Sequence, residues 1–227
     1  MKTNSPLLTL LILMFALSAC TIDSYETGEG DYSTLQAEMV EAHANSQKQI
    51  DYADADNGER LNLSQPLSKD WVTTGDTFYR GLLYYKKNGT TVDVVSLQQI
   101  SEIGIQSTDS LKKRHIEIKT DPLSLEGIWV SKNKRYLNAS IHLKIGTTTD
   151  TNAIHHIGMV ADSIHVNGNG GKTLCLRLTH DQGGMPEHYT VTTLFSLPLK
   201  DVGNIVDSIR IDINTYDGMT TKCLSVK

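Results

Sequence analysis

The residues in this chain best placed to do chemistry are its three cysteines. Cys20 follows the small residues Ser18 and Ala19, at the end of an apolar run from Leu7 to Leu17. A hydrophobic run of this length, then small residues, then a cysteine, is the order in which a bacterial lipoprotein precursor is cut and acylated. The run is shorter than the roughly 20 apolar residues that span a bilayer as a helix. We therefore expect Cys20 to become a lipidated N-terminus, and a signal peptide with a chance cysteine is the alternative.

A lipidated Cys20 would fix the location of everything that follows it. One acyl chain holds a protein only marginally, whereas two or three chains hold it durably. We expect residues 1–19 to be removed and residues 20–31, which are acidic, to form a flexible tether. This predicts a palmitate-bearing protein in the cell envelope, at the outer membrane, facing the periplasm or the surface. Acidic residues behind the cysteine also resemble sorting signals of some Gram-negative bacteria, although a plain solvated linker is equally consistent with them.

The other two cysteines form an even pair in an oxidising compartment. Alternation places Cys175 on the same side of its strand as Arg177, and Cys223 on the same side as Ser225. Both thiols therefore lie on polar faces. If their two strands are neighbours in one sheet, a disulfide between Cys175 and Cys223 can form, and two unlinked thiols are the alternative.

Histidines are frequent in the second half of the chain, but their spacing does not indicate a metal site. Adjacent His155 and His156 point to opposite faces of a strand, so one ion cannot readily bind both. The sequence has no HExxH helix, no paired CxxC and no GxSxG elbow. We interpret the histidines as solvated and expect no metal, no cofactor and no catalytic residues, so the protein is predicted not to be an enzyme.

Composition narrows the partners. The 227 residues include 26 acidic and 21 basic side chains, and the formal net charge is −5. Phosphate binding needs a concentrated basic face, so nucleic acid is not an expected partner. The expected partners are the membrane, through the lipid, and an unknown envelope protein or glycan.

The elements that carry these residues are predicted to be strands. Residues 32–105 contain short segments of alternating polarity, separated by turn residues such as Asn57-Gly58 and Asn88-Gly89. About five strands in so short a segment suit a small barrel of the OB type, and an SH3-like barrel is the alternative. The expected strands lie around 34–39, 49–53, 60–63, 77–86 and 91–96.

The second half is predicted to be a separate sandwich. Residues 106–122 are polar and end at Pro122, so we interpret them as a linker, in which Ile116 and Ile118 could add a short strand. Residues 136–145 alternate most regularly, which indicates one buried and one solvated face. With the segments at 128–130, 153–161, 173–180, 188–197, 207–214 and 219–226, residues 123–227 hold seven strands, as in an immunoglobulin-like β-sandwich. The predicted fold class is therefore all-β.

The layout as a whole resembles a known family. The lipobox, five N-terminal strands, a second module that opens at Trp129, and a closing hairpin from 207–209 to 216–218 together resemble the NigD-like lipoproteins. The resemblance implies an N-terminal OB-type domain joined to a C-terminal β-sandwich, and it brings no catalytic residues. The family name comes from a bacteriocin-associated locus, which suggests immunity or envelope stress.

Three functions are then open. The first is a non-enzymatic envelope lipoprotein that binds an unknown partner, with a bacteriocin-associated immunity-type protein as one form of it. The second is a carbohydrate-binding accessory in which Trp71, Tyr79, Tyr84 or Trp129 stack on sugar rings, although core packing is the default for such aromatics. The third, a hydrolase, would need a cleft with coupled carboxylates.

Overall fold

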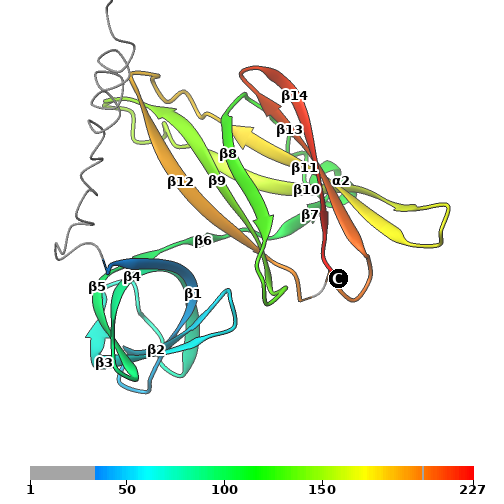
Figure 1. Ribbon diagram of the computed structural model, residues 1–227. Coiled ribbons are helices and arrows are strands. Elements are labelled where there is room, and N and C mark those ends of the chain that lie inside the picture. The colour runs from blue at the N-terminus through cyan, green and yellow to red at the C-terminus, as the bar shows by residue number, and fades with distance from the viewer. Residues whose placement is uncertain (1–33, 201) are drawn as a thin grey trace, which may run out of the picture. The chain divides into compact units, whose positions relative to one another are not determined.

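The computed structural model describes residues 34–200 and 202–227, and strands dominate them (Figure 1). The all-β prediction is confirmed. The predictions for the signal peptide, for Cys20 and for the tether lie outside the described residues. Within the described ranges, none of the helical structure is long and apolar enough to cross a membrane.

Five strands close into a barrel in the order β1-β2-β3-β5-β4, with β4 returning to β1. The step from β3 to β5 is parallel and joins Leu63 to Val92, whereas the other pairs are antiparallel. A small five-stranded barrel is the OB architecture, so that prediction is confirmed. The strands are β1 (Gln36–Ala44), β2 (Gln49–Ala55), β3 (Arg60–Ser68), β4 (Thr77–Asn88) and β5 (Thr91–Gln99).

Side-chain size explains how so small a barrel is filled. The buried positions of β1 and β2 are largely alanines, whereas β4 contributes Leu83 and Tyr85, both fully buried. Small residues opposite large ones fit a tapering interior. The turn between β2 and β3 places Gly58 at φ 93°, and the predicted Asn57-Gly58 hairpin is present.

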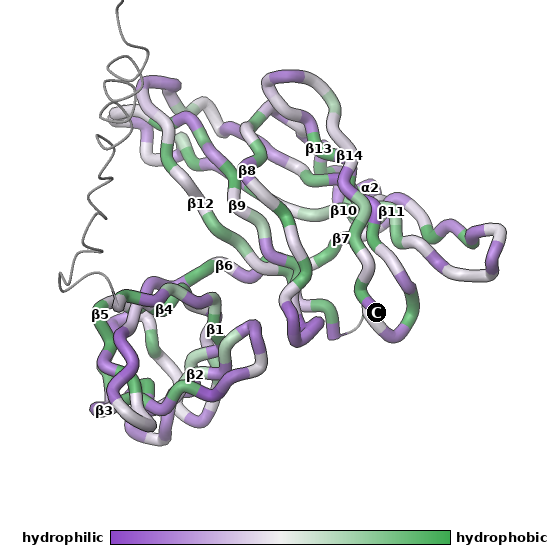
Figure 2. Tube along the Cα trace, viewed as in Figure 1, coloured by the Kyte–Doolittle hydropathy of each residue, from purple (hydrophilic) through white to green (hydrophobic). Residues whose placement is uncertain are grey.

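Two further sheets share one core and form the sandwich. All seven expected strands are present, and β6 and β7 join them. The five-stranded sheet contains β14 (Gly218–Ser225), β13 (Ser208–Thr215), β11 (Lys172–Asp181), β10 (His156–Val166) and β7 (Ile105–Ser107), in that order. The four-stranded sheet contains β6 (Ser101–Glu102), β12 (Tyr189–Pro198), β9 (Tyr136–Ile145) and β8 (Ser124–Val130). Figure 2 shows apolar and polar residues mixed along these strands, as expected for two-faced sheets.

The two faces of β9 do not both agree with the predicted alternation of buried and solvated residues. Its apolar residues Leu137, Ala139 and Ile141 are fully buried in the sandwich core. On the other face, however, Asn138 is also fully buried and Ser140 nearly so. The prediction of a wet face is therefore wrong for this part of β9, because Arg80 of β4 hydrogen-bonds to Asn138 and covers it.

Residues 106–122, interpreted above as a linker, contain regular structure. β7 runs parallel to β10, and the short helix α2 (Thr108–Lys113) follows it, capped by the Ser107 side chain, which accepts a hydrogen bond from the Ser110 amide. The expected strand at Ile116 and Ile118 is absent from this described segment. Instead the chain continues to a parallel bridge between Thr120 and His180 of β11.

These pairings define a strap, residues 108–119. The strap begins beside β10, because β7 pairs with that strand. It ends at the other edge of β11, because Thr120 bridges to His180 and the β10 side of His180 is already paired with Ile157. The strap therefore crosses the outer face of β10 and β11. Leu111 in α2 is buried, which fixes the strap to this face.

Candidate functional site

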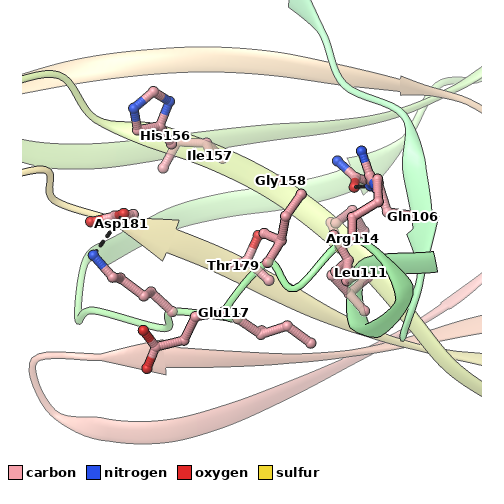
Figure 3. A pocket seen from close by; sticks show the side chains of 14 residues that line it. Gln106, Leu111, Arg114, Glu117, His156, Ile157, Gly158, Thr179 and Asp181 are labelled. Atoms are coloured by element: carbon pink, nitrogen blue, oxygen red, sulfur yellow. Dashed lines mark hydrogen bonds and ion pairs between the residues drawn. The ribbon is translucent and has the colours of Figure 1, made fainter. Parts of the chain in front are cut away.

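A groove of about 290 Å³ lies between the strap and the outer face of β10 and β11 (Figure 3). Its floor is formed by Gly158 and Val160 of β10 and Thr179 of β11, which point outward because their neighbours along each strand face the sandwich core. Its apolar walls come from the strap, with Leu111, Ile116 and Ile118.

Gly158 is the residue that leaves room at the centre of the floor. It stands opposite Thr179 in the β10–β11 register, and a Cβ at this position would lie 2.8 Å from the Thr179 Oγ1. That distance is shorter than van der Waals contact, so any larger residue at Gly158 would force Thr179 to move. The hollow thus depends on a glycine within a strand, where glycine otherwise lowers stability.

The two ends of the groove differ in charge. At one end the Arg114 guanidinium donates hydrogen bonds to two neutral acceptors, Gln106 Oε1 at 2.6 Å and the Ser110 carbonyl oxygen at 3.3 Å. At the other end Lys119 and Asp181 form an ion pair at 2.9 Å, drawn as a dashed line in Figure 3. The hydrogen bond from Lys119, followed by that from the Gly183 amide, holds the pKa of Asp181 below its ordinary value.

These features define what the groove can bind. An apolar centre favours an extended apolar group. Among the described residues the Arg114 guanidinium bonds to neutral oxygens, so its charge is available at this end, while the Glu117 carboxylate also lines the groove. A ligand or partner segment with an apolar stretch and an anionic terminus would match both properties.

The buried charges of the molecule lie elsewhere, between the barrel and the sandwich. The fully buried Arg80 side chain makes a bidentate ion pair with Asp56, at 2.8 and 2.6 Å. It also donates to Ser196 Oγ at 2.9 Å and to Asn138 Oδ1 at 3.0 Å, and it lies 4.1 Å from the Tyr136 ring. Arg80 thus bonds to the turn after β2, through Asp56, and to two strands of the sandwich, through Asn138 and Ser196, so the network is structural.

A second buried carboxylate extends the network. Glu41 Oε1 accepts hydrogen bonds from Arg135 and from the Tyr136 hydroxyl, both at 2.9 Å, and Glu41 Oε2 faces Arg135 in an ion pair. Burial raises the pKa of the Tyr136 hydroxyl, and the negative charge of Glu41 raises it further. Tyr136 therefore stays a hydrogen-bond donor to Glu41, and neither buried carboxylate is presented to a cleft.

An aromatic row crosses the outer face of the barrel. His43 of β1 stacks on Tyr52 of β2 at 4.5 Å and meets Phe78 of β4 edge-on at 5.2 Å. Arg60 covers the Tyr52 ring at 4.1 Å and is held there by a bidentate pair with Asp54. The Tyr52 ring is therefore already in contact with the His43 ring and the Arg60 guanidinium.

The structure does not gather the four predicted stacking residues. Trp71 and Tyr79 meet edge-on at 5.6 Å and pack against the barrel core, and the Tyr79 hydroxyl bonds to the backbone of Thr74. Tyr84 is half-buried on β4, and Trp129 is 38% exposed on β8. These residues do not form a single open platform.

Of the two alternatives for Cys175 and Cys223, the structure has unlinked thiols and not the disulfide. Cys175 of β11 pairs with Arg210 of β13, and Arg210 pairs with Cys223 of β14. Two strand spacings separate the Cα atoms of the cysteines by about 9.6 Å, beyond the reach of a disulfide. The two thiols do share one face, as alternation indicated, but β13 lies between their strands.

One of the histidines also differs from its prediction. His180 is buried rather than solvated, and its ring lies close to that of His155, with centroids 5.1 Å apart and an angle of 22° between the ring planes. Across residues 34–200 and 202–227, no three His, Cys, Asp or Glu side chains are grouped in a way that could hold a metal ion.

Sequence reasoning missed the groove. Its only signal was the unusual alternation of Ile116 and Ile118 with charged residues in an otherwise polar segment, which indicated a strand instead. Gly158 gave no signal, because a glycine within a strand pattern also indicates a bulge.

Comparison with known proteins places this architecture. The profile of the NigD-like C-terminal beta sandwich domain matches residues 105–225, which include β7 and the strap. A search of curated proteins finds no significant match.

Solved structures of several proteins share the fold. A NigD-like immunity protein from Bacteroides caccae is 27% identical over 85% of this chain and 92% of its own, with a TM-score of 0.62. A protein of unknown function from Bacteroides vulgatus is 17% identical (85% and 90% covered, TM-score 0.62). A provisionally named lipoprotein from Bacteroides fragilis is 10% identical (85% and 98% covered, TM-score 0.61). For the Bacteroides vulgatus and Bacteroides fragilis proteins, at 17% and 10% identity, the similarity shows only a shared fold.

Proposed function

Because this chain belongs to the NigD-like family, we propose that it is a lipid-anchored envelope protein that binds a partner and does not catalyse a reaction. The observation that carries the proposal is the order of its parts. A lipobox that ends at Cys20 and an acidic segment precede a barrel and a sandwich of that family. Residues so arranged would hold a folded binding module close to a membrane surface.

The anchor is tested by replacing Cys20 with alanine. The parent protein is expected to incorporate labelled palmitate and to partition into detergent, and the Cys20→Ala protein to do neither. Trypsin treatment of intact cells would then separate a surface orientation from a periplasmic one. Unchanged palmitate labelling in Cys20→Ala would disprove lipidation at this residue.

The binding role is assigned to the groove beneath the strap. It combines an apolar centre with a guanidinium that bonds to neutral oxygens, and both properties favour an amphipathic ligand with an anionic terminus. The buried carboxylates support a non-catalytic role, because Asp56 and Glu41 are occupied by Arg80, Arg135 and Tyr136.

The groove is tested by filling it and by removing its charge. Cross-linking in intact cells, followed by affinity purification, is expected to recover a partner with the parent protein. Much less of it is expected with Gly158→Val, which fills the floor, or Arg114→Gln. Lys200→Gln, on an exposed residue far along the chain from the strap, is the control. Equal recovery of the same partner by both groove variants would assign binding to another surface.

An immunity-type role is a second candidate, favoured by the NigD-like immunity protein of Bacteroides caccae. A strain that lacks this protein would then be sensitised to a bacteriocin from a neighbouring strain, and the complete gene would restore protection. A deletion strain that resists every such toxin as its parent does would remove this role.

A carbohydrate-binding accessory is less well supported. The aromatic row of the barrel has its central Tyr52 covered by His43 and Arg60, and Trp71 and Tyr79 pack on the core. Glycan arrays probed with the mature protein test it directly, and specific binding that Trp129→Ala abolishes would restore this candidate.

A further inference from the structure

His155 and His180 form a continuous hydrogen-bonded chain between two backbone carbonyl groups. The Nδ1 of His180 lies 3.0 Å from the Asp121 carbonyl oxygen, and its Nε2 lies 2.9 Å from Nδ1 of His155. The Nε2 of His155 lies 3.0 Å from the Lys144 carbonyl oxygen. We call these four groups the clasp. It links the chain just beyond the strap, at Asp121, to the end of β9, at Lys144.

The number of protons in the clasp follows from its two ends. A carbonyl oxygen can only accept a hydrogen bond, so the ring nitrogen facing each carbonyl must carry a proton. The contact between the two rings needs a third proton. Two neutral imidazoles carry only one N–H each, so in a neutral pair one of the three contacts would set two lone pairs against each other at about 3 Å.

We propose that His155 and His180 share three protons on their four ring nitrogens, so that the clasp carries one positive charge and works as a pH-sensitive latch on the strap. With two protons, one of the three contacts has no proton, so either a carbonyl group loses its hydrogen bond or two lone pairs face each other between the rings. With four protons, two N–H groups face each other across the 2.9 Å contact between the rings. The clasp is complete only in the singly charged state, and this would hold whether or not the groove binds a ligand.

The burial of the two rings decides where the charge resides. His180 is only 3% exposed, whereas His155 is half-buried. Burial lowers the pKa of His180 and the positive charge of His155 lowers it further, while the hydrogen bond to the Asp121 carbonyl and the Asp121 charge act in the opposite direction without cancelling the shift. In the proposed state His155 therefore carries both of its protons, and His180 keeps only the one on Nδ1, which is donated to Asp121.

Charged groups on each neighbouring element are compatible with this assignment. On the β9 side, Lys144 pairs with Glu187 at 2.9 Å and lies 4.2 Å from the Tyr216 ring. Hydrogen bonds from Lys144 and Gln182 lower the pKa of Glu187, and the charges of Lys144 and then His155 add to this. On the other side the Asp121 carboxylate accepts a hydrogen bond from the Gln182 amide, at 2.8 Å. The other titratable groups at this end of the groove are the Lys119–Asp181 pair, Glu117, whose charge acts on Lys119, and His156.

The clasp also explains how the strap is held. Around His180 the backbone makes two further bonds to the same segment, from the Asp121 amide to the His180 carbonyl at 2.8 Å and from the His180 amide to the Lys119 carbonyl at 3.0 Å. Loss of the ring bond to Asp121 would leave these two bonds at the end of a largely exposed segment. The strap, and with it the roof of the groove, would then open more often.

The first experiment counts the protons by NMR. Side-chain ¹⁵N shifts of His155 and His180 are recorded from pH 5 to 8.5 on the mature chain, with Cys20→Ser to prevent lipidation. We expect a pH range in which both His155 nitrogens are protonated while Nε2 of His180 is bare. A direct change from two protons to four, with no three-proton state at any pH, would overturn the proposal.

The second experiment measures the latch through amide hydrogen exchange of Asp121 and His180. The exchange rates are corrected for the intrinsic pH dependence of amide exchange. Above the pH range of the three-proton state, the corrected rates are expected to be about threefold to tenfold higher than within it, which is the effect of one lost hydrogen bond. His155→Gln is expected to abolish this rise while the chain still folds, and His165→Gln, on the exposed part of β10, to retain it. A rise of the same size in His155→Gln would overturn the latch even if three protons were found.

Discussion

Replacement of Arg80 by methionine is the most demanding test of the contacts that join the barrel to the sandwich. Methionine fills similar space but removes the hydrogen bonds that Arg80 donates to Asp56, Asn138 and Ser196, at 2.6 to 3.0 Å. Asp56 keeps only the hydrogen bond from the Asn138 side chain, at 2.7 Å, which does not neutralise its charge. Removal of one partner from a buried ion pair costs about 3–5 kcal/mol, because the other charge remains buried and uncompensated. For a chain of this size that corresponds to a fall in Tm of about 6–20 °C.

The assay is urea unfolding followed by circular dichroism, with thermal scans alongside. The matched control is Arg60→Met, because Arg60 makes a bidentate pair of similar geometry with Asp54 on the exposed surface of the barrel. An exposed pair contributes about 0–1 kcal/mol, so the two arginines should differ severalfold in their effect. In addition, Asp56→Asn combined with Arg80→Met should cost less than the sum of the two single changes, because the orphaned charge is gone.

The reasoning would be refuted by a loss below about 1 kcal/mol in Arg80→Met, the value of an exposed pair. It would also be refuted by strictly additive single changes, since residues that share one network couple by about 0.5–3 kcal/mol. Either result would mean that the barrel and the sandwich are joined mainly by other contacts.

Three further predictions follow from single positions. An alanine in the left-handed backbone region costs roughly 1–2 kcal/mol, and Gly184→Ala, which has open space around the new Cβ, should lose about that amount in urea unfolding. Gly183→Ala should lose more, because its new Cβ would overlap the Ile154 carbonyl oxygen. Met159→Ala, in the centre of the sandwich core, should cost about 2–5 kcal/mol in the same assay, and a smaller loss would mean that the core collapses around it. Because the pKa of His180 is lowered in the folded protein, the unfolded chain binds a proton more readily below pH 6.5. The free energy of unfolding should therefore fall as the pH drops through 6.5 and stay constant below the folded-state pKa. His180→Gln should lack this pH dependence.

Strands were the most predictable part of this fold. Alternation and short apolar runs between turn residues located all five barrel strands and all seven main strands of the sandwich, because these strands are long enough to show such patterns. β6 and β7 were missed, since two or three residues show no period. Helix α2 was missed for a similar reason, because its six residues place only Leu111 in the core.

The candidate site was less predictable, because it depends on which strands become neighbours. Alternation correctly placed Cys175 and Cys223 on one face, but not β13 between them. The pairing of His155 with His180 required a register between β10 and β11 that single-strand patterns do not contain. Asn138 appeared solvated for the same reason, since its cover comes from Arg80, far away in the sequence.

The parallel strand pairs have a consequence for the order in which the chain can fold. Every strand of the barrel lies between residues 36 and 99, so the barrel can close as soon as that stretch is available. β6 and β7 come next, yet their partners are β12 and β10, and β11 must wait for β13. Such distant pairings raise contact order and slow folding. During synthesis from the N-terminus, the sandwich strands would keep unpaired edges beside a folded barrel until the β13–β14 hairpin is synthesised. In this interval the protein would be most prone to aggregation and most dependent on chaperones.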